Sequence, residues 1–283
     1  MRRLGVLGWP VAHSRSPAMH NAALAALGLH DWHYQRLPVP PEVFDPTVRG
    51  LPELGFVGAN VTIPHKQAAL ALADTATDEA AAIGAANTLT FAGGAVHAAN
   101  TDAPGLLAAL PASPAGQVAL VLGAGGSARA AAYALRTAGA RRVAVWNRTP
   151  DRARALAEDL GVDVAIAPIA ADLLVNCTSV GLADGGFKEL PLPADGLGEY
   201  ATVVDLVYRD GGTELAAQAR HRGCTVVDGL EILVRQGALS LSAWTGREAP
   251  LETMRAAAAG SACDHHVPGT SLPSQRGAPS GDR

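Results

Sequence analysis

A glycine-rich turn between an apolar strand and a helix constrains this chain more than any other feature. Val118–Leu122 is a continuous apolar run, Gly123–Ala128 reads Gly-Ala-Gly-Gly-Ser-Ala, and a helical pattern over Ala128–Ala138 follows. This order fits the G-x-G-x-x-A fingerprint. Its first glycine allows the tight turn, its second lets the backbone approach a pyrophosphate, and its small last residue lets helix and strand pack closely. The unpaired N–H groups that begin the helix can then bind phosphates.

The neighbouring segments decide whether this loop indicates a dinucleotide site. A lone match to the fingerprint is weak evidence in a chain with 31 glycines. A second strand is predicted at Arg142–Trp146 and a second helix at Asp151–Leu160, with Thr149 placed to cap it. Further apolar strands are predicted at Leu173–Asn176, Val203–Leu206 and Thr225–Val227. This alternation predicts a doubly wound parallel sheet with helices on both faces. We therefore predict a dinucleotide-binding half from about residue 117 to 229, the alternative being a merely structural turn.

The residues after the second strand bear on the choice of cofactor. An NAD site usually places Asp or Glu here for the ribose hydroxyls, whereas this chain has Asn147-Arg148-Thr149. An arginine binds the 2′-phosphate that a carboxylate would repel, and each charge-assisted hydrogen bond contributes roughly 1.5–3 kcal/mol. The alternative is that Arg148 and Arg152 lie on a solvated helix face, with Asp151 adding a negative charge nearby. We favour NADP(H) over NAD(H).

The first hundred residues also alternate strand-like and helix-like segments. Strands are predicted at Leu4–Leu7, Trp32–Leu37 and Phe56–Ile63, and Gly93-Gly94 indicates a hairpin between Asn87–Phe91 and Ala95–Ala99. Residues 111–116 form a plausible linker. Near the C-terminus, one apolar stripe from Leu230 to Leu241 predicts a long helix, and a second helix is expected around Leu251–Ala259. From Gly260 onward the composition predicts a disordered tail.

Polar residues interrupt the apolar segments of this N-terminal region at three places. They are Ser14-Arg15-Ser16; Asn60 with Thr62 and Lys66; and Asn87-Thr88 with Asn100-Thr101-Asp102. If the strands share a sheet, these groups converge at one edge and suit a small polyhydroxy substrate, because each desolvated hydroxyl needs a partner. Taken singly they have simpler explanations: Ser16 as a helix cap, Asn60 and Asn100 as turn residues, and Lys66 and Asp102 as solvated charges.

Composition excludes several classes of protein. The net charge of −4 gives no electrostatic reason to expect a nucleic-acid or membrane partner. Cys177, Cys224 and Cys263 are scattered, which argues against a disulfide framework and a zinc site, so no metal is expected and a cytoplasmic location is favoured. The Met1-Arg2-Arg3 start faintly resembles a secretory signal, but polar residues and Pro10 interrupt the apolar run early.

Several spaced motifs together strongly resemble the shikimate dehydrogenase family. They are Gly8–Pro17, Gly58–Lys66, Gly84–Thr88, Asn100-Thr101-Asp102, the loop from Gly123, Asn147-Arg148-Thr149 and Asp228-Gly229-Leu230. The resemblance runs from about residue 5 to 246. It implies a two-domain α/β enzyme that reduces 3-dehydroshikimate to shikimate with NADPH. The implied substrate domain consists of residues 1–104 together with the C-terminal helices of 229–259. An NADP-binding Rossmann domain is implied at 105–228, and the tail occupies 260–283.

The resemblance also implies roles for individual residues. Lys66 and Asp102 match the family's catalytic pair, Ser14 and Ser16 its carboxylate-binding serines, and Tyr208 a tyrosine near that carboxylate. The remaining substrate-binding candidates are Asn60, Thr62, Asn87 and Gln236. The cofactor-binding candidates are Gly123, Ala124, Gly125, Gly126, Ser127, Asn147, Arg148, Thr149, Arg152, Thr178, Ser179, Leu206 and Gly229.

Four positions depart from common family versions: Trp9, His65, Ala103 and Glu231. Only His65 adds a titratable group beside Lys66, and we weigh a packing role against proton transfer for it. A reduced ketone oxygen needs a proton and a nearby cation, and a lysine ammonium, charged at neutral pH, supplies both. The alternatives are a quinate or quinate/shikimate dehydrogenase and a non-catalytic nucleotide- or metabolite-sensing homologue. The sequence leaves a homodimer open.

Overall fold

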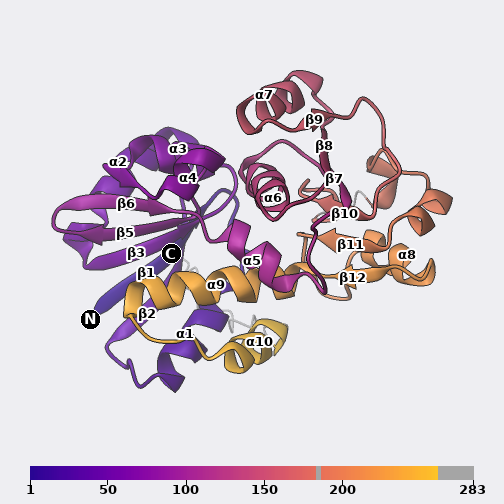
Figure 1. Cartoon of the computed structure of the whole chain (residues 1–283). Helices are drawn as coiled ribbons and strands as arrows, with labels where there is room; N and C mark the ends of the chain where they lie inside the picture. Colours follow the sequence, from indigo (N-terminus) through magenta and orange to yellow (C-terminus); the bar gives the residue numbers. More distant parts are fainter. Residues whose placement is uncertain (183–185, 261–283) are drawn as a thin grey trace, which may run out of the picture.

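Two six-stranded sheets, each covered by helices, make up the computed structural model, which describes residues 1–182 and 186–260 (Figure 1). The first sheet has the order β2-β1-β3-β5-β6-β4. Its strands are β1 (Arg2–Gly8), β2 (Trp32–Pro38), β3 (Phe56–Val61), β4 (Thr75–Ala76), β5 (Thr88–Ala92) and β6 (Ala95–Ala99). β1 is parallel to both β2 and β3, while β5 is antiparallel to β3 and β6. The predicted hairpin is confirmed as β5–β6.

The second sheet is parallel throughout, with the order β12-β11-β10-β7-β8-β9. Its strands are β7 (Val118–Leu122), β8 (Arg142–Trp146), β9 (Asp163–Val164), β10 (Leu173–Asn176), β11 (Thr202–Asp205) and β12 (Thr225–Val227). The strand order reverses between β7 and β10, and in such sheets ligands bind outside the carboxyl ends of the strands at this point. The predicted doubly wound parallel sheet is confirmed.

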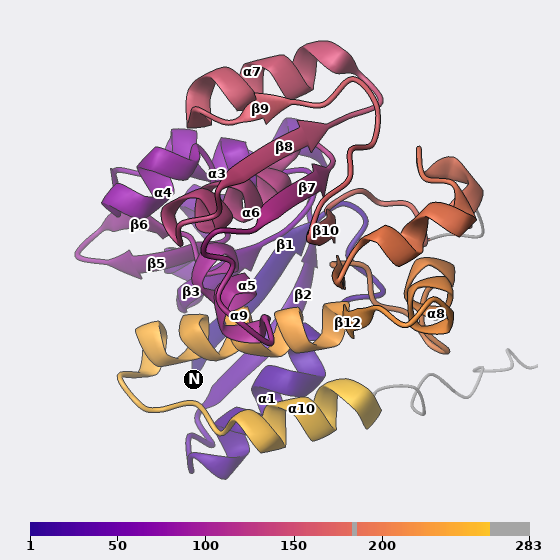
Figure 2. The ribbon, with the colours of Figure 1, turned by 45° about the vertical axis from the view of Figure 1, so that its right-hand side comes forward.

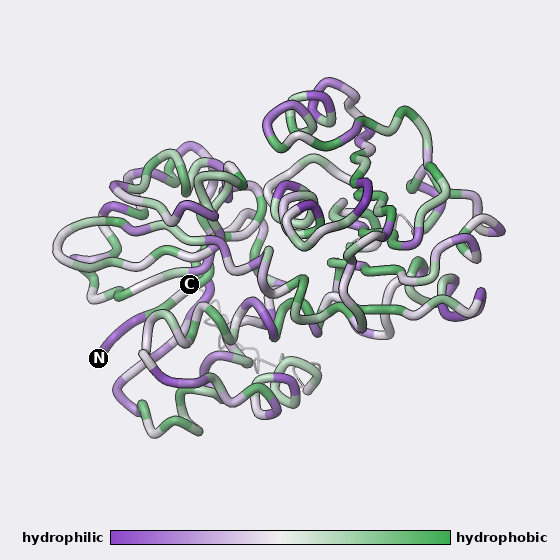
Figure 3. The backbone as a smooth tube through the Cα atoms, in the orientation of Figure 1, coloured by the Kyte–Doolittle hydropathy of each residue, from purple (hydrophilic) through white to green (hydrophobic). Residues whose placement is uncertain are grey.

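Small aliphatic residues form the core of this second half. On β7, Ala119 and Val121 face one layer while Leu120 and Leu122 face the other, as expected for a strand buried on both sides. The helices here are α6 (Gly126–Thr137), α7 (Pro150–Leu160) and α8 (Glu214–His221), with 3-10 turns at Phe187–Glu189 and Ala194–Glu199. Hydrophilic and hydrophobic colours alternate along α7, which packs one face on the sheet (Figure 3).

Helices from both ends of the chain cover one face of the first sheet (Figure 2). They are α1 (Ser16–Ala26), α9 (Gly229–Thr245) and α10 (Leu251–Gly260), and their shared core includes Met19, Tyr34, Val234, Leu241 and Met254. The other face is covered by α2 (Phe44–Gly50), α3 (Lys66–Leu72) and α4 (Asp78–Ile83), with 3-10 turns at Pro41–Val43 and Pro52–Leu54. Between the halves, α5 (Asp102–Ala109) packs against both α6 and α9.

Two local predictions are wrong, and a third, the cap at Thr149, is confirmed only for the position of the residue. Ser16 is the first residue of α1 and the N-cap position is Arg15, so Ser16 does not cap the helix. Thr149 occupies the N-cap of α7, but its hydroxyl makes no capping hydrogen bond. The third strand ends at Val61 instead of Ile63, because the His65 N–H bonds to the Thr62 carbonyl and closes a turn.

The described part of the chain contains no helix that is long and apolar enough to cross a membrane. The predicted tail lies outside the described residues, apart from Gly260, which ends α10. Cys263 lies outside them as well, and the two cysteines that are described, Cys177 and Cys224, are both free thiols.

Candidate active site

Two cavities meet between the sheets, outside the carboxyl ends of β1, β3, β7, β10 and β11. The first has a volume of about 170 Å³ and the second about 690 Å³, so the second accepts the larger ligand. Both are lined by Ile63, Lys66, Ser127, Cys177, Thr178 and Ser179. Ligands held in the two cavities would therefore meet beside these six residues.

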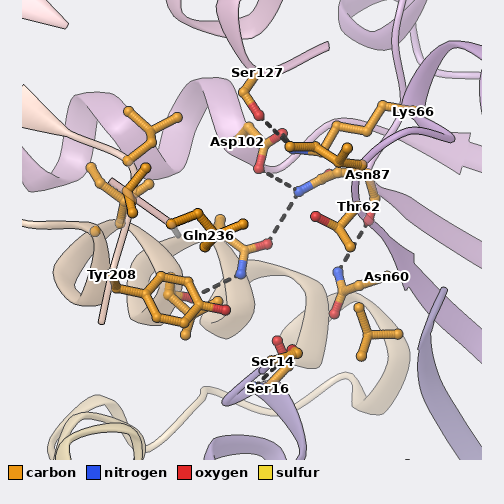
Figure 4. A pocket seen from close by; sticks show the side chains of 18 of the residues that line it. Ser14, Ser16, Asn60, Thr62, Lys66, Asn87, Asp102, Ser127, Tyr208 and Gln236 are labelled. Atoms are coloured by element: carbon orange, nitrogen blue, oxygen red, sulfur yellow. Dashed lines mark hydrogen bonds and ion pairs between the residues drawn. The ribbon is translucent and has the colours of Figure 1, made fainter. Parts of the chain in front are cut away.

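Lys66 lies at this junction and joins the two halves of the molecule. It is the first residue of α3, and its Nζ donates hydrogen bonds to Asp102 Oδ2 at 2.7 Å and to Ser127 Oγ at 2.8 Å (Figure 4). Asp102 begins α5, while Ser127 belongs to the glycine-rich loop. Lys66 is only 9% exposed, so the alternative of a solvated surface charge is wrong. A buried ammonium held by a carboxylate is poised to give a proton to either cavity.

Asn87 fixes the other oxygen of the carboxylate. Its Nδ2 donates to Asp102 Oδ1 at 2.8 Å and approaches Gln236 Oε1 at 3.1 Å, while its Oδ1 accepts the Thr101 N–H at 2.7 Å. Asn100 Oδ1 accepts the N–H of Asp102, which is the turn role expected for that residue. Because each group is held by another, the carboxylate has one defined orientation.

Asn60 belongs to a buried network behind the first cavity. It lies within β3, so its predicted turn role is wrong. The Tyr34 hydroxyl donates to Asn60 Oδ1 at 2.8 Å, and Asn60 Nδ2 donates to Ser240 Oγ at 2.8 Å. Ser240 is fully buried, and its hydroxyl also lies 3.0 Å from Thr88 Oγ1 and 3.1 Å from Thr101 Oγ1. Ser240 was not among the residues predicted from the sequence, although its four-residue spacing from Gln236 on one predicted helix placed the two on the same face.

Ser14, Ser16 and Tyr208 gather at the opposite end of the first cavity from Lys66 (Figure 4). Both serines are buried, and the Ser16 N–H points to Ser14 Oγ at 3.3 Å. Burial raises the pKa of Tyr208, while hydrogen bonds to the Ser14 side chain and the Arg15 backbone act in the opposite direction. All nine predicted catalytic and substrate-binding residues line this cavity.

The second cavity brings together most of the predicted cofactor residues. Its lining includes Gly123, Ala124, Gly125, Gly126, Ser127, Asn147, Arg148, Arg152, Thr178 and Ser179. Leu206 and Gly229 line the first cavity instead, and Thr149 lines neither. Arg148 and Arg152 are exposed and form no ion pair with any residue of 1–182 or 186–260. Asp151 pairs with Arg154, so it does not oppose the two arginines.

Two glycines of the loop are required for different reasons. Gly123 has a φ of +110°, a conformation that favours glycine, and an added Cβ would lie 3.1 Å from the Cys177 backbone. A Cβ on Gly126 would lie 2.7 Å from the Cβ of Lys66. The loop therefore leaves its backbone open to a pyrophosphate while Lys66 packs against it. With two arginines on the same cavity, these residues fit NADP(H).

His65, which introduced a second titratable side chain, is a packing residue. It is 2% exposed and lines neither cavity, and its Nε2 lies 2.7 Å from the Val39 carbonyl. Its ring stacks on Phe44 at 4.3 Å. Burial lowers the pKa of His65, so the ring is neutral at neutral pH. These contacts favour the packing role over proton transfer.

No group of three or more His, Cys, Asp or Glu residues could hold a metal ion within the described ranges. The groups that face the first cavity include the Lys66–Asp102 pair and the side chains of Ser14, Ser16 and Tyr208. Cys177 lies at the junction, but burial raises the pKa of its thiol, which keeps it protonated.

Comparisons with known proteins agree with this geometry. Residues 6–89 match the family model for the shikimate dehydrogenase substrate binding domain, 108–177 that for shikimate/quinate 5-dehydrogenase, and 229–259 that for the shikimate 5′-dehydrogenase C-terminal domain. Shikimate dehydrogenase (NADP(+)) of Methanopyrus kandleri is 44% identical, over 90% of this chain and 93% of that protein. The enzyme of the same name from a strain of Thermus thermophilus is 49% identical, over 87% and 93%.

A solved structure is similar over almost its whole length. It is the shikimate 5-dehydrogenase of Thermus thermophilus in complex with NADP(H) and shikimate, with a TM-score of 0.82 and 45% identity over 92% of this chain and 99% of that one.

Proposed function

The chain belongs to the shikimate dehydrogenase family, and we propose that it catalyses the reversible NADPH-dependent reduction of 3-dehydroshikimate to shikimate. The observation that carries this proposal is the place of Lys66. Its ammonium lies where the two cavities meet, 2.7 Å from a carboxylate of the first half and 2.8 Å from a hydroxyl of the second. A non-catalytic sensor would have no need for such a pair.

The second cavity would hold the cofactor. The N–H groups that begin α6 and the loop Gly123–Ser127 would bind its pyrophosphate, and Arg148 with Arg152 would bind the 2′-phosphate. When bound, NADPH supplies the hydride. Thr178 and Ser179 line both cavities and border the reacting end.

Lys66 handles the proton. As the ring ketone is reduced its oxygen gains negative charge, which the Lys66 ammonium stabilises before it donates a proton to that oxygen. Asp102 holds the ammonium with one carboxylate oxygen and accepts a hydrogen bond from the ring hydroxyl next to the ketone. In the reverse direction Lys66 takes the proton from the ring hydroxyl, and because oxidation of shikimate releases a proton overall, it is favoured by higher pH.

The remaining side chains orient the substrate. Ser14, Ser16 and Tyr208 bind its carboxylate at the far end of the cavity. Thr62, Asn87 and Gln236 contact the ring hydroxyls, while Asn60 is held by Tyr34 and Ser240 at the cavity wall. A wall of side chains that hold one another by hydrogen bonds can position a polyhydroxy ring, because its hydroxyls meet partners in fixed places.

The division of the chain follows from the same proposal. We assign 1–104 and 229–259 to substrate binding and 105–228 to the cofactor, supported by the packing of α9 against β3 and of α10 against α1 and α9. The free thiols of Cys177 and Cys224 support a cytoplasmic location.

Replacing Lys66 by methionine tests the catalytic assignment. Lys66→Met keeps the length of the side chain and removes its charge and proton, so turnover should fall by about 10²–10⁴-fold. NADPH binding, measured by fluorescence titration, should stay within about threefold of wild type, because the loop and both arginines are untouched. Near-normal turnover in this variant would remove Lys66 from the reaction.

A further inference from the structure

Arg36 lies directly behind the carboxylate end of the first cavity. It is on β2, and both its Nε and its Nη2 donate to the main-chain carbonyl of Ser14, at 3.0 and 2.6 Å. The guanidinium lines neither cavity. No acidic side chain of the described ranges forms an ion pair with Arg36, so its positive charge is not neutralised. A half-buried cation therefore stands one peptide unit away from the substrate-binding serines.

The neighbouring arginine differs in this respect. The Arg15 guanidinium forms an ion pair with Asp210 and donates to the Ala258 carbonyl at 2.9 Å. Its charge is therefore partly neutralised. Both arginines act on the Tyr208 hydroxyl, but of the two only Arg36 has no ion pair with a described carboxylate.

The Ser14–Arg15 peptide carries the effect of this charge to the cavity. Its carbonyl accepts two guanidinium N–H groups, which polarises the peptide and strengthens the N–H donor on its other side. Arg15 is also the N-cap of α1, where the helix dipole places partial positive charge. Burial lowers the pKa of the His13 ring, and the charge of Arg36 lowers it further. At Tyr208, burial raises the pKa of the hydroxyl, and the charges of Arg15 and Arg36 both oppose that rise.

We propose that Arg36 is a positioning residue that makes the first cavity select an anionic substrate over an uncharged one of the same shape. It does so by holding the Ser14 carbonyl and by placing an unneutralised positive charge behind it. This inference rests on the proposed function, which puts the substrate carboxylate against Ser14, Ser16 and Tyr208.

The experiment compares shikimate with its carboxamide, which has the same ring and hydroxyls but no charge, at saturating NADP⁺. Where the carboxamide is not turned over, its inhibition constant takes the place of its KM. In Arg36→Gln, the KM for shikimate should rise by about three- to tenfold, while the constant for the carboxamide and both kcat values stay within about twofold. Arg36→Lys keeps the charge but loses the paired guanidinium donors, so its KM for shikimate should rise clearly less than that of Arg36→Gln.

Arg247→Gln is the matched control. Arg247 also donates to a main-chain carbonyl, that of Leu27 at 2.6 Å, and it lines neither cavity. Its replacement should leave both constants unchanged, which separates a local effect from a general loss of positive charge.

Three results would overturn the inference. In the first, Arg36→Gln weakens the carboxamide as much as shikimate, which would make Arg36 a support for the turn alone. In the second, Arg36→Lys behaves like Arg36→Gln. In the third, which does not depend on any variant folding, the wild-type protein binds the carboxamide as tightly as shikimate. Failure of the proposed function is distinct from all three, because wild-type protein would then not oxidise shikimate at all.

Discussion

The two cavities that meet at Lys66 are built in opposite ways. The cofactor cavity has one continuous loop, Gly123–Ser127, and two exposed arginines, Arg148 and Arg152, in its lining, beside residues of several other segments. The substrate cavity is formed by side chains from distant segments, and most of them are buried and hydrogen-bonded to one another. Phosphates can be bound by backbone N–H groups that every residue but proline has, whereas ring hydroxyls need particular side chains in fixed positions.

This difference predicts where substitutions act. Changes in the substrate cavity should lower turnover, because they disturb groups that hold one another in place. Changes in the cofactor cavity should raise the KM for the nucleotide and spare the chemistry.

The largest expected effect is that of Asp102→Asn. The carboxylate accepts hydrogen bonds from both Lys66 and Asn87, and an amide cannot accept both in the same orientation. We expect kcat to fall by about 10²-fold or more, with NADPH affinity unchanged in a fluorescence titration. Asp45→Asn, which removes an exposed carboxylate from α2, serves as the control. A parallel loss of NADPH binding would show that the two cavities are not separable.

Arg148→Ala should affect the cofactor alone. Loss of a charge-assisted contact to the 2′-phosphate should raise the KM for NADPH by about 10- to 100-fold and leave the KM for NADH nearly unchanged. Arg154→Ala is matched to it, because Arg154 lies on α7, which follows Arg148 directly, pairs with Asp151 and does not line the cavity. Equal effects of Arg148→Ala on both nucleotides would contradict the 2′-phosphate assignment.

Gly126→Ala is expected to be an exception: it changes the cofactor loop but should lower turnover. The new Cβ would lie 2.7 Å from the Cβ of Lys66, so this change in the cofactor loop should displace the lysine and lower kcat by about tenfold. At Gly125 nothing lies within 4 Å of an added Cβ, so Gly125→Ala should raise the KM for NADPH and spare kcat. Steady-state kinetics of Gly126→Ala and Gly125→Ala tests this difference. Identical kcat values for the two variants would show that the position of Lys66 does not depend on the loop.

The smallest expected effect concerns stability behind the substrate cavity. His20 is fully buried, stacks on Tyr34 at 4.2 Å, and neither of its ring nitrogens has a hydrogen-bond partner among the described residues. Burial lowers the pKa of His20 to about 3. Because the folded pKa lies below the unfolded value near 6.5, stability is complete above that pH and is lost as the pH falls toward 3.

Between pH 7.5 and 5.5, the unfolded state takes up a proton on His20 that the folded state does not. The free energy of unfolding should therefore fall by about 1 kcal/mol over this range. Denaturant titrations of His20→Phe should lack that component, while His33→Gln, at an exposed position on β2, should keep it. An unchanged pH dependence in His20→Phe would mean that His20 is not the group responsible.

The same contrast explains what the sequence could and could not predict. The loop and Arg148 lie in one stretch of chain, where strand, turn and helix are visible as a pattern. The roles of Ser16, Asn60 and Lys66 depended on which strands become neighbours, so judging them one at a time gave a cap, a turn residue and a surface charge. The resemblance to the family assigned all three residues to one site, and in the structure all three line one cavity.

The support behind the site could not be predicted in this way. Ser240 reaches Asn60 only because α9 returns from the far end of the chain to pack on the first sheet. Arg36 meets the Ser14 carbonyl only because β2 pairs with β1 in parallel, with Val6 opposite Arg36. Both contacts join segments with no local relation in sequence, so they follow from the register of the sheet and the packing of the helices.

The central claim is that this site reduces a ring ketone that carries a carboxylate, using NADPH. The most direct test is a comparison of initial rates with shikimate and quinate, each with NADP⁺ and with NAD⁺. Quinate has an additional hydroxyl on the carbon that bears the carboxylate, so it must be accommodated beside Ser14 and Ser16. We predict the highest kcat/KM for shikimate with NADP⁺, by at least about tenfold over each other pair. Equal or faster oxidation of quinate, or a preference for NAD⁺, would contradict the account.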